Sequence, residues 1–353
     1  MDINLLQGIF KKHDCDAILF VDPKNLRYMC GFRGNNGLLF YTREGKMLLV
    51  TDPRFELEAK QEVKNAEIII NIKESSLWEM PDFYREHGIK KLGFSPKAMS
   101  VEMYNAIKKE AEMIAVDIIP SAYRYIKSPE EIKIMKEAAR IPEAALGETV
   151  GMLENAPTER VFAAYLDHHM RLHGSDKPSF DTIIAFAENS AVVHAIPSDK
   201  QISGTGFLLI DWGAIYDGYC SDETVTYMLG KPTKEMIKLY DEVYTAQRRA
   251  IDAIKPGVTA VELYDKAYGY LIEKGYKKYI QHALGHHIGL DIHEYPKIFP
   301  FTDFTFREGM TFTIEPGLYI PELGGVRIED TVMVTSTGVE LLTSIPKERK
   351  IIL

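Results

Sequence analysis

The stretch FLLIDWGAIYDGYCSDETVTYML, residues 207–229, carries two aspartates where a strand would normally place apolar residues. Four apolar residues run directly into Asp211, and after a polar turn the chain re-enters an extended pattern at Asp222. A two-stranded hairpin of this length can bring both carboxylates onto one face. Neighbouring carboxylates repel unless a cation or a shared proton compensates them, so this pair indicates a functional site. Asp217, beside Gly218, is instead expected to belong to the turn.

A second acidic region follows in TIEPGLYIPELGGVRIEDTV, residues 313–332. Glu315 ends an apolar strand just before a Pro-Gly turn, and Glu329 lies inside an alternating run. Strand periodicity places Arg327 and Glu329 on one face, with Asp330 on the other, where we expect a surface or turn contact. A glutamate inside a strand is costly unless it is paired or binds a metal. A salt bridge to Arg327 and a metal site both remain open for Glu329.

The segment HALGHHIGLDIHEYP, residues 282–296, holds four of the chain's ten histidines. Four carboxylates at strand ends and one imidazole from this segment would form an oxygen-rich ligand set. Such a set suits Mn²⁺, Fe²⁺, Co²⁺ or Zn²⁺ better than a closed structural zinc site, which favours sulfur. Four negative charges indicate two divalent ions. Two ions about 3.5–4 Å apart can share carboxylates and a water whose pKa falls towards about 7.

Length and composition limit the class of protein. The chain has 353 residues, which predicts two domains, and a net charge of −9, which provides no general attraction to nucleic acid or anionic lipid. No run is long and apolar enough for a membrane helix, and the N-terminus does not have the features of a signal peptide. Cys15, Cys30 and Cys220 form no CxxC motif, so we expect structural thiols in a reducing cytoplasm.

The domain organisation follows from a change in pattern along the chain. Residues 1–121 alternate short apolar strands, such as DAILFVD at 16–22, with helical segments, and this predicts a compact α/β domain. We see no chemical constellation in it. A boundary is predicted near residues 120–128, and residues 128–353 then form the domain that carries the acidic motifs.

The second domain opens on a helix start. Ser128 is a predicted N-cap, Pro129 suits the first helical position, and Glu131 completes a capping box. Pro142 interrupts the pattern, and we expect it to kink or end the helix because it lacks an N–H and clashes one turn back.

Five motifs in order carry a resemblance to a known family: ENSAVVHAIPSD, DWGAIYDGYCSDETVT, GHHIGLDIHEYP, TIEPGLY and GGVRIED. Together they resemble the two-metal pita-bread peptidases and, within that group, the Xaa-Pro peptidases prolidase and aminopeptidase P. The resemblance covers nearly the whole chain. It implies a fold of α/β plus α+β class, with a small N-terminal domain like that of creatinase and prolidase. A pita-bread catalytic domain like that of creatinase and the aminopeptidases follows.

The resemblance also implies roles for individual residues. The matched metal ligands are Asp211, Asp222, His286, Glu315 and Glu329. Asp222 and Glu329 match the positions that bridge both ions, Asp211 matches a ligand of one ion, and His286 and Glu315 match ligands of the other. Glu315 also matches the position that shuttles a proton from the bridging water.

Three further residues match positions that bind no metal. His194 and His293 match the two histidines that contact substrate and stabilise the tetrahedral oxyanion. Arg327 matches an arginine held near the bridging glutamate. His282 is either a wall of the pocket or a structural residue.

The sequence departs from the family pattern at several positions. Val225 stands where an arginine is common, Val193 where proline is frequent, and His287 where glycine is usual. Pro142 falls within what is normally an unbroken helix. Val225 and His287 could alter the shape of the pocket, and therefore substrate preference, but none of these positions is a ligand.

The sequence therefore predicts a cytoplasmic metallo-exopeptidase that hydrolyses the N-terminal Xaa-Pro bond of dipeptides or short peptides. The nucleophile would be a metal-bridging hydroxide, with two divalent ions (Mn, Co, Zn or Fe) as cofactors. A homodimer is implied by the resemblance alone. Lys297 is a candidate for binding the carboxylate of a dipeptide, although a surface lysine is the simpler interpretation. The alternatives are an inactive peptidase-like binding protein and an enzyme like methionine aminopeptidase.

Overall fold

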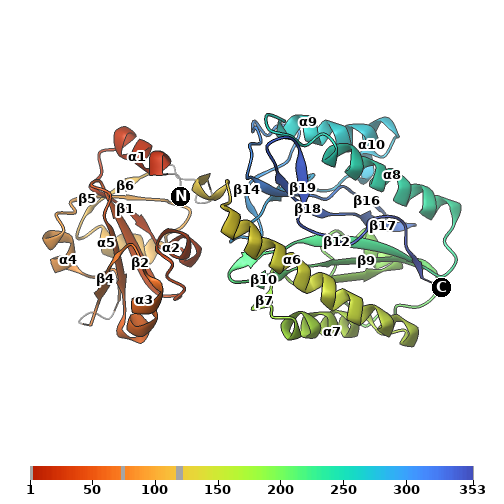
Figure 1. Ribbon diagram of the computed structural model, residues 1–353, viewed down its shortest axis with the longest axis horizontal. Coiled ribbons are helices and arrows are strands. Elements are labelled where there is room, and N and C mark those ends of the chain that lie inside the picture. Colours follow the sequence, from red (N-terminus) through yellow and green to blue (C-terminus); the bar gives the residue numbers. More distant parts are fainter. Residues whose placement is uncertain (1–2, 73–75, 117–121, 353) are drawn as a thin grey trace. The chain divides into compact units, whose positions relative to one another are not determined.

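The computed structural model describes residues 3–72, 76–116 and 122–352 (Figure 1). The chain divides into two compact units, one ending at Arg124 and the other beginning at Tyr125. The N-terminal unit is an α/β domain, as predicted.

The N-terminal unit is built on a six-stranded mixed sheet with strand order β4-β3-β2-β1-β5-β6. Its strands are β1 (Ala17–Phe20), β2 (Gly37–Thr42), β3 (Met47–Thr51), β4 (Glu67–Ile70), β5 (Lys91–Phe94) and β6 (Glu112–Ala115). Its helices are α1 (Ile3–Lys12), α2 (Pro23–Cys30), α3 (Glu56–Glu62), α4 (Pro81–Glu86) and α5 (Val101–Ile107). Ile18 and Phe20 pack in one apolar cluster, while Ala17 and Leu19 pack in another. Both faces of β1 are therefore buried, which explains its continuous apolar sequence.

The second unit begins with two helices that pack on each other, α6 (Pro129–Thr149) and α7 (Glu159–Leu172). Ser128 and Glu131 form the predicted capping box at the start of α6. Pro142 does not end this helix, because α6 continues for seven residues beyond it. Pro142 is buried, and its carbonyl accepts a hydrogen bond of 2.8 Å from Trp212 Nε1. Burial and the contact with Trp212 thus hold Pro142 within the helix, although it cannot donate the helical hydrogen bond one turn back.

The remaining helices of the second unit are α8 (Lys234–Ile251), α9 (Ala260–Tyr264) and α10 (Tyr270–Glu273). Its first strands are β7 (Lys177–Pro178), β8 (Ile183–Phe186), β9 (Gly206–Trp212), β10 (Ala214–Tyr216), β11 (Tyr219–Cys220) and β12 (Glu223–Leu229). The later strands are β13 (His286–His287), β14 (Glu294–Lys297), β15 (Thr311–Ile314), β16 (Gly317–Ile320), β17 (Gly324–Arg327), β18 (Asp330–Val334), β19 (Val339–Leu341) and β20 (Ile351–Ile352).

Two sheets form the centre of this unit, with orders β20-β12-β9-β8 and β14-β13-β15-β18-β19. An apolar cluster joins α6 and α7 to the first sheet, while α8 packs against β15, β16 and β17 (Figure 1). Helices thus pack against both groups of strands and help to bury them, so polar side chains within the strands need partners or ligands.

The decisive stretch 207–229 forms two successive hairpin ladders rather than one. β9 pairs with β12, with Thr224 opposite Asp211, and β10 pairs with β11 around the turn at Asp217. Gly213 separates the ladders, and a Cβ there would lie only 2.1 Å from the carbonyl oxygen of Ser221. The close approach at Gly213 lets the chain change sheets while Asp211 and Asp222 stay near each other.

Two general predictions about the chain can be compared with the fold. Cys15, Cys30 and Cys220 are all buried and form no disulfide with one another. Among the residues that the structure describes, no helix is long and apolar enough to cross a membrane.

Candidate metal centre and active site

One cavity of about 560 Å³ in the second unit brings the predicted site residues together. Its lining includes Asp211, Asp222, His286, Glu315, Glu329, His194, His293 and Arg327. These residues come from the two central sheets, the β16–β17 region and two loops. The sequence reasoning placed them in one site, and the structure lines one cavity with them.

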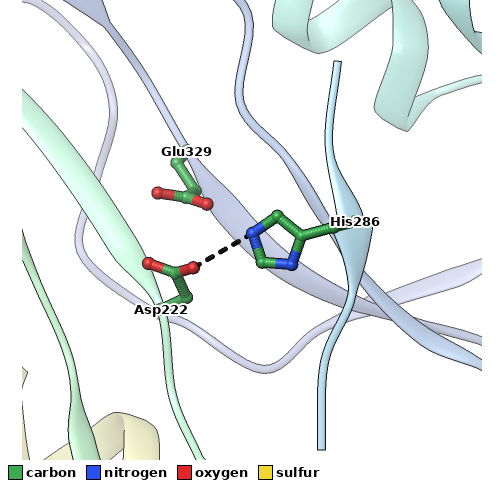
Figure 2. A group of neighbouring side chains, drawn as sticks. All are labelled: Asp222, His286 and Glu329. Carbon is green, nitrogen blue, oxygen red and sulfur yellow. Dashed lines mark ion pairs between the residues drawn. The ribbon is translucent and has the colours of Figure 1, made fainter. Parts of the chain in front are cut away.

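Asp222, His286 and Glu329 form the tightest group (Figure 2). Each offers one ligand atom, these atoms lie within 4.8 Å of one another, and all three residues are buried. The imidazole Nε2 of His286 lies 3.3 Å from Asp222 Oδ2. Asp222 immediately precedes β12, His286 begins β13, and Glu329 lies between β17 and β18.

Asp211 and Glu315 lie at the edges of this group. Glu315 Oε1 is 3.5 Å from the Nε2 of His286, and Oε2 is 3.7 Å from the Nδ1 of His282. Asp211 Oδ2 accepts a hydrogen bond of 2.5 Å from Arg327 Nη2. Arg327 thus forms its salt bridge with Asp211. A salt bridge to Arg327 therefore does not account for the buried position of Glu329, and the metal-site interpretation is favoured.

The electrostatics of the group reflect crowded negative charge. Burial, reinforced by the charge of Asp211, raises the pKa of Asp222 well above its usual value. Burial and the charge of Asp222 do the same to the pKa of Glu329. Burial raises the pKa of Glu315 to about 7, and burial lowers the pKa of His286. Without cations, the site therefore disfavours the charged forms of its own side chains.

A divalent cation fits the donor set of this site. Asp211 Oδ1 and Glu329 Oε1 are buried and have no hydrogen-bond partner among the described atoms. Buried carboxylate oxygens without partners are costly, and a cation would satisfy them. Carboxylate oxygens with one imidazole nitrogen are ligands that Mn²⁺, Fe²⁺, Co²⁺ and Zn²⁺ all accept.

A hydrogen-bonded layer holds the ligands in place. Arg327 Nη1 donates to the hydroxyl of Tyr319 at 2.6 Å, and that hydroxyl lies 2.8 Å from His282 Nε2. Thr224 Oγ1 donates to Glu329 Oε2 at 2.7 Å and accepts from Arg327 Nε at 3.2 Å. His282 lines the cavity and also belongs to this hydrogen-bonded layer, so it is both part of the pocket wall and a structural residue.

His293 and His194 lie on the wall of the cavity outside the ligand group. The ring of His293 meets the ring of His286 edge to face, with centroids 4.4 Å apart. Arg327 Nη1 donates to the carbonyl of Val193 at 3.3 Å, immediately before His194. Both histidines therefore share the wall of the cavity with the acid cluster.

Two departures from the family pattern lie away from the cavity. Val225 is buried in the apolar cluster of α6 and α7 and is not among the residues that line the cavity. His287 is fully buried and stacks on Phe306, with ring centroids 5.5 Å apart. Burial lowers the pKa of His287 to about 3, so its imidazole is a neutral structural group.

The predicted position of Asp330 is wrong. It was expected at the surface or in a turn, but it is buried and lies 3.5 Å from Lys347 Nζ. It also accepts hydrogen bonds from Gln247 and Thr343. Lys347 forms a second buried ion pair with Glu223. Sequence reasoning missed this network, because Lys347 reads as an ordinary lysine near the C-terminus.

A buried cluster of carboxylates with one imidazole, in a cavity between two sheets, defines a candidate metallohydrolase centre. Residues 133–336 match the model of metallopeptidase family M24, and residues 3–126 match the creatinase/prolidase N-terminal domain. The chain belongs to metallopeptidase family M24. The predicted pita-bread fold class is confirmed by this match and by the solved structures below.

Similar proteins extend over the whole length of the chain. An uncharacterized peptidase of Bacillus subtilis is 36% identical over 351 residues, covering 99% of each protein. A Xaa-Pro dipeptidase of Pyrococcus horikoshii is 37% identical, covering 96% of this chain and 95% of that protein. A solved Xaa-Pro dipeptidase from Bacillus anthracis superposes with a TM-score of 0.94 at 36% identity, covering 99% of each chain. The solved structure of an X-Pro aminopeptidase from Thermotoga maritima superposes with a TM-score of 0.89 at 31% identity, covering 98% of this chain and 100% of that one.

Proposed function

We propose that this chain is a dinuclear metal-dependent peptidase that hydrolyses the N-terminal Xaa-Pro bond of dipeptides or short peptides. One observation carries the proposal: the five candidate ligands and two further histidines line a single cavity. Relatives named Xaa-Pro dipeptidase at 36–37% identity support the substrate class.

The ligand residues divide as the resemblance implies. Asp222 and Glu329 would be shared by two cations, Asp211 would complete one position, and His286 with Glu315 would complete the other. When bound, the cations would polarise the scissile carbonyl and lower the pKa of a water. We expect Mn²⁺, Co²⁺, Zn²⁺ or Fe²⁺ to serve, and a panel of these ions added to chelated protein identifies those that do.

The protein's own residues would perform the remaining steps. A carboxylate oxygen of Glu315 would accept the proton of the attacking water and deliver it to the prolyl nitrogen as that group leaves. His293 and His194 would donate hydrogen bonds to the substrate and to the developing oxyanion. Arg327 would hold Asp211 in place through the 2.5 Å hydrogen bond between them.

Lys297 provides a basis for preferring dipeptides. It lies on the wall of the same cavity as His293, where its ammonium could bind the free carboxylate of a proline residue. A charge-assisted hydrogen bond of this kind contributes about 1.5–3 kcal/mol. We therefore expect Ala-Pro to be a better substrate than Ala-Pro-Ala.

The test compares hydrolysis of Ala-Pro and Ala-Pro-Ala by metal-loaded protein, with Asp222→Asn as the inactive control. Lys297→Met should raise KM for Ala-Pro by about 10-fold or more and leave Ala-Pro-Ala little changed. Lys278→Met, a lysine outside the cavity lining, is the matched control. Absence of hydrolysis of any Xaa-Pro peptide would overturn the proposed activity.

Two further properties are proposed on the resemblance alone. A homodimer is expected, and light scattering coupled to size-exclusion chromatography measures it. The predicted location is the cytoplasm, which cell fractionation checks.

A further inference from the structure

Glu159 is a buried acid that the predicted chemistry does not use. It is the first residue of α7, directly after the N-cap Thr158, and its relative exposure is 0%. Its carboxylate accepts five hydrogen bonds, which come from the backbone N–H of Phe186 and Ser198, the hydroxyl of Ser198 and, at both oxygens, the amide of Asn189. The lengths run from 2.6 to 3.0 Å.

The donors to Glu159 lie outside α7, in the segment that runs from the end of β8 to Ser198. Phe186 ends β8, and Ser198 lies twelve positions later, where the chain turns towards β9. Between these two points lies His194, one of the two candidate substrate-contacting histidines. Glu159 therefore holds both ends of the loop 187–198, which we call the His194 loop.

The middle of the His194 loop is fixed by other contacts. Gly325 N donates to Ser190 Oγ at 2.8 Å, and a Cβ on Gly325 would lie only 2.0 Å from the carbonyl of Ser190. Arg327 contacts the carbonyl of Val193, as described above. The loop is thus pinned near His194 by the active-site strands and at its two ends by Glu159.

The hydrogen-bond donors around Glu159 require a carboxylate at this position in order to stay paired. Glu159 forms no ion pair among the residues that the structure describes, so neutral donors and the positive end of α7 must stabilise its charge. A glutamine at this position would present an NH₂ group to donors that need an acceptor. Buried polar groups left unpaired cost about 1–3 kcal/mol each, enough to displace one end of the loop.

We propose that Glu159 is a positioning residue that sets the place of His194 by clamping both ends of the His194 loop. The effect on catalysis rests on the proposed function, whereas the effect on the loop does not. A displacement of about 1 Å in a group that contacts substrate can cost about 10²-fold in rate. The clamp therefore acts through His194 and leaves the metal ligands in place.

A double-mutant cycle tests this coupling in the full-length, metal-loaded chain. Glu159→Gln should lower kcat/KM for Ala-Pro by about 10- to 100-fold when His194 is present. In a His194→Ala background the same change should cost less than about 2-fold, because the residue through which it acts is already lost. Equal losses in both backgrounds would show a general structural defect and overturn the proposal.

Two controls separate the clamp from other effects. Glu188→Gln removes an exposed glutamate of the same loop, which pairs with Lys200, and should change kcat/KM by less than about 2-fold. The metal content of Glu159→Gln should equal that of the wild-type chain. If Glu159→Gln does not fold, Ser198→Ala removes one donor of the clamp and should show the same dependence on His194 at smaller size.

Hydrogen exchange gives a readout that is independent of activity. Glu159→Gln should accelerate amide exchange in residues 187–198 and leave the segment around His293 unchanged. Unchanged exchange in the loop would overturn the clamp. If the wild-type chain hydrolyses no Xaa-Pro peptide, the proposed function fails, while the exchange measurement still decides whether Glu159 holds the loop.

Discussion

Asp222 and Glu223 are consecutive residues, as are Glu329 and Asp330, yet the two members of each pair lie in opposite surroundings. Asp222 and Glu329 line the cavity with His286. Glu223 and Asp330 lie behind the strands, where Lys347 forms ion pairs with both. Consecutive residues of an extended chain point to opposite sides, so one strand pair carries two layers of buried acid. We call these the cavity face and the rear face.

The two faces differ in how their charge is compensated. On the rear face one ammonium serves two carboxylates, helped by hydrogen bonds from Gln247 and Thr343. On the cavity face Arg327 forms an ion pair with one of the four carboxylates, that of Asp211, and Asp211 Oδ1 and Glu329 Oε1 have no hydrogen-bond partner among the described atoms. The rear face pairs both of its carboxylates with Lys347, although Glu223 Oε2 also has no hydrogen-bond partner among the described atoms. The cavity face holds more carboxylates than the chain's own cation can pair, and it therefore requires cations from outside.

The largest expected effect is that of Asp222→Asn on the cavity face. Loss of a shared ligand should prevent binding of the metal pair, and activity should fall by roughly 10³-fold or more. The metal-free variant should be at least as stable as the metal-free wild type, because the change removes a repulsive charge. Mass spectrometry of bound metal and chemical denaturation in chelator measure the two effects. A metal-free variant that is clearly less stable would contradict the contrast between the faces.

The second expected effect is that of Lys347→Met on the rear face. Removing the only basic partner shown for Glu223 leaves buried acids uncompensated, which costs about 3–5 kcal/mol of unfolding free energy. The triple variant with Glu223→Gln and Asp330→Asn should recover most of this loss. Metal stoichiometry should not change in the triple variant, since the cavity face is intact.

The control for this prediction is Lys136→Met, which breaks an exposed ion pair with Glu340 and should cost less than about 1 kcal/mol. Denaturation curves of the wild type, Lys347→Met, the triple variant and Lys136→Met measure these differences in unfolding free energy. If the triple variant does not regain the lost unfolding free energy, Lys347 stabilises the chain by packing instead of by charge.

The cavity face could be predicted from the sequence, and the rear face could not. Asp211 and Glu315 end apolar runs, where a carboxylate has no structural reason to lie, and this position singles them out. Their assignment as metal ligands, with the choice of His286, came from the family resemblance. Lys347 meets Glu223 across 124 positions of sequence, and no local pattern reports such a contact.

The same limit applies to Glu159 and Pro142. Glu159 lies where any helix favours an acid, so its role as a clamp has no sequence signature. Pro142 breaks helices in isolation, but here the packing around Trp212 overrides that preference. Local sequence patterns therefore identify residues, such as a carboxylate at the end of an apolar strand, that do not fit the pattern around them. They do not identify residues whose role depends on a contact with a distant part of the chain.

The smallest expected effect concerns His286 and His287, which divide between the faces in the same way. Burial holds the pKa of His287 at about 3 in the folded chain, against about 6.5 when unfolded. The unfolded state therefore binds the extra proton, and stability is lost as pH falls from 6.5 towards 3.

For this residue the loss is about 2 kcal/mol between pH 6.5 and pH 5. His287→Phe should remove that part of the pH dependence and leave the metal content unchanged. Unfolding free energies at a series of pH values measure it, and a slope equal to that of the wild type would contradict the buried, neutral imidazole.

The central claim is that the cavity face is a binding site for two divalent cations. Calorimetric titration of chelated wild-type chain with Mn²⁺ tests it most directly, with Asp222→Asn and Lys136→Met titrated alongside. We predict two ions per chain for the wild type and for Lys136→Met, and loss of this paired binding in Asp222→Asn. Absence of binding to the wild type, or the same binding in Asp222→Asn, would contradict the account.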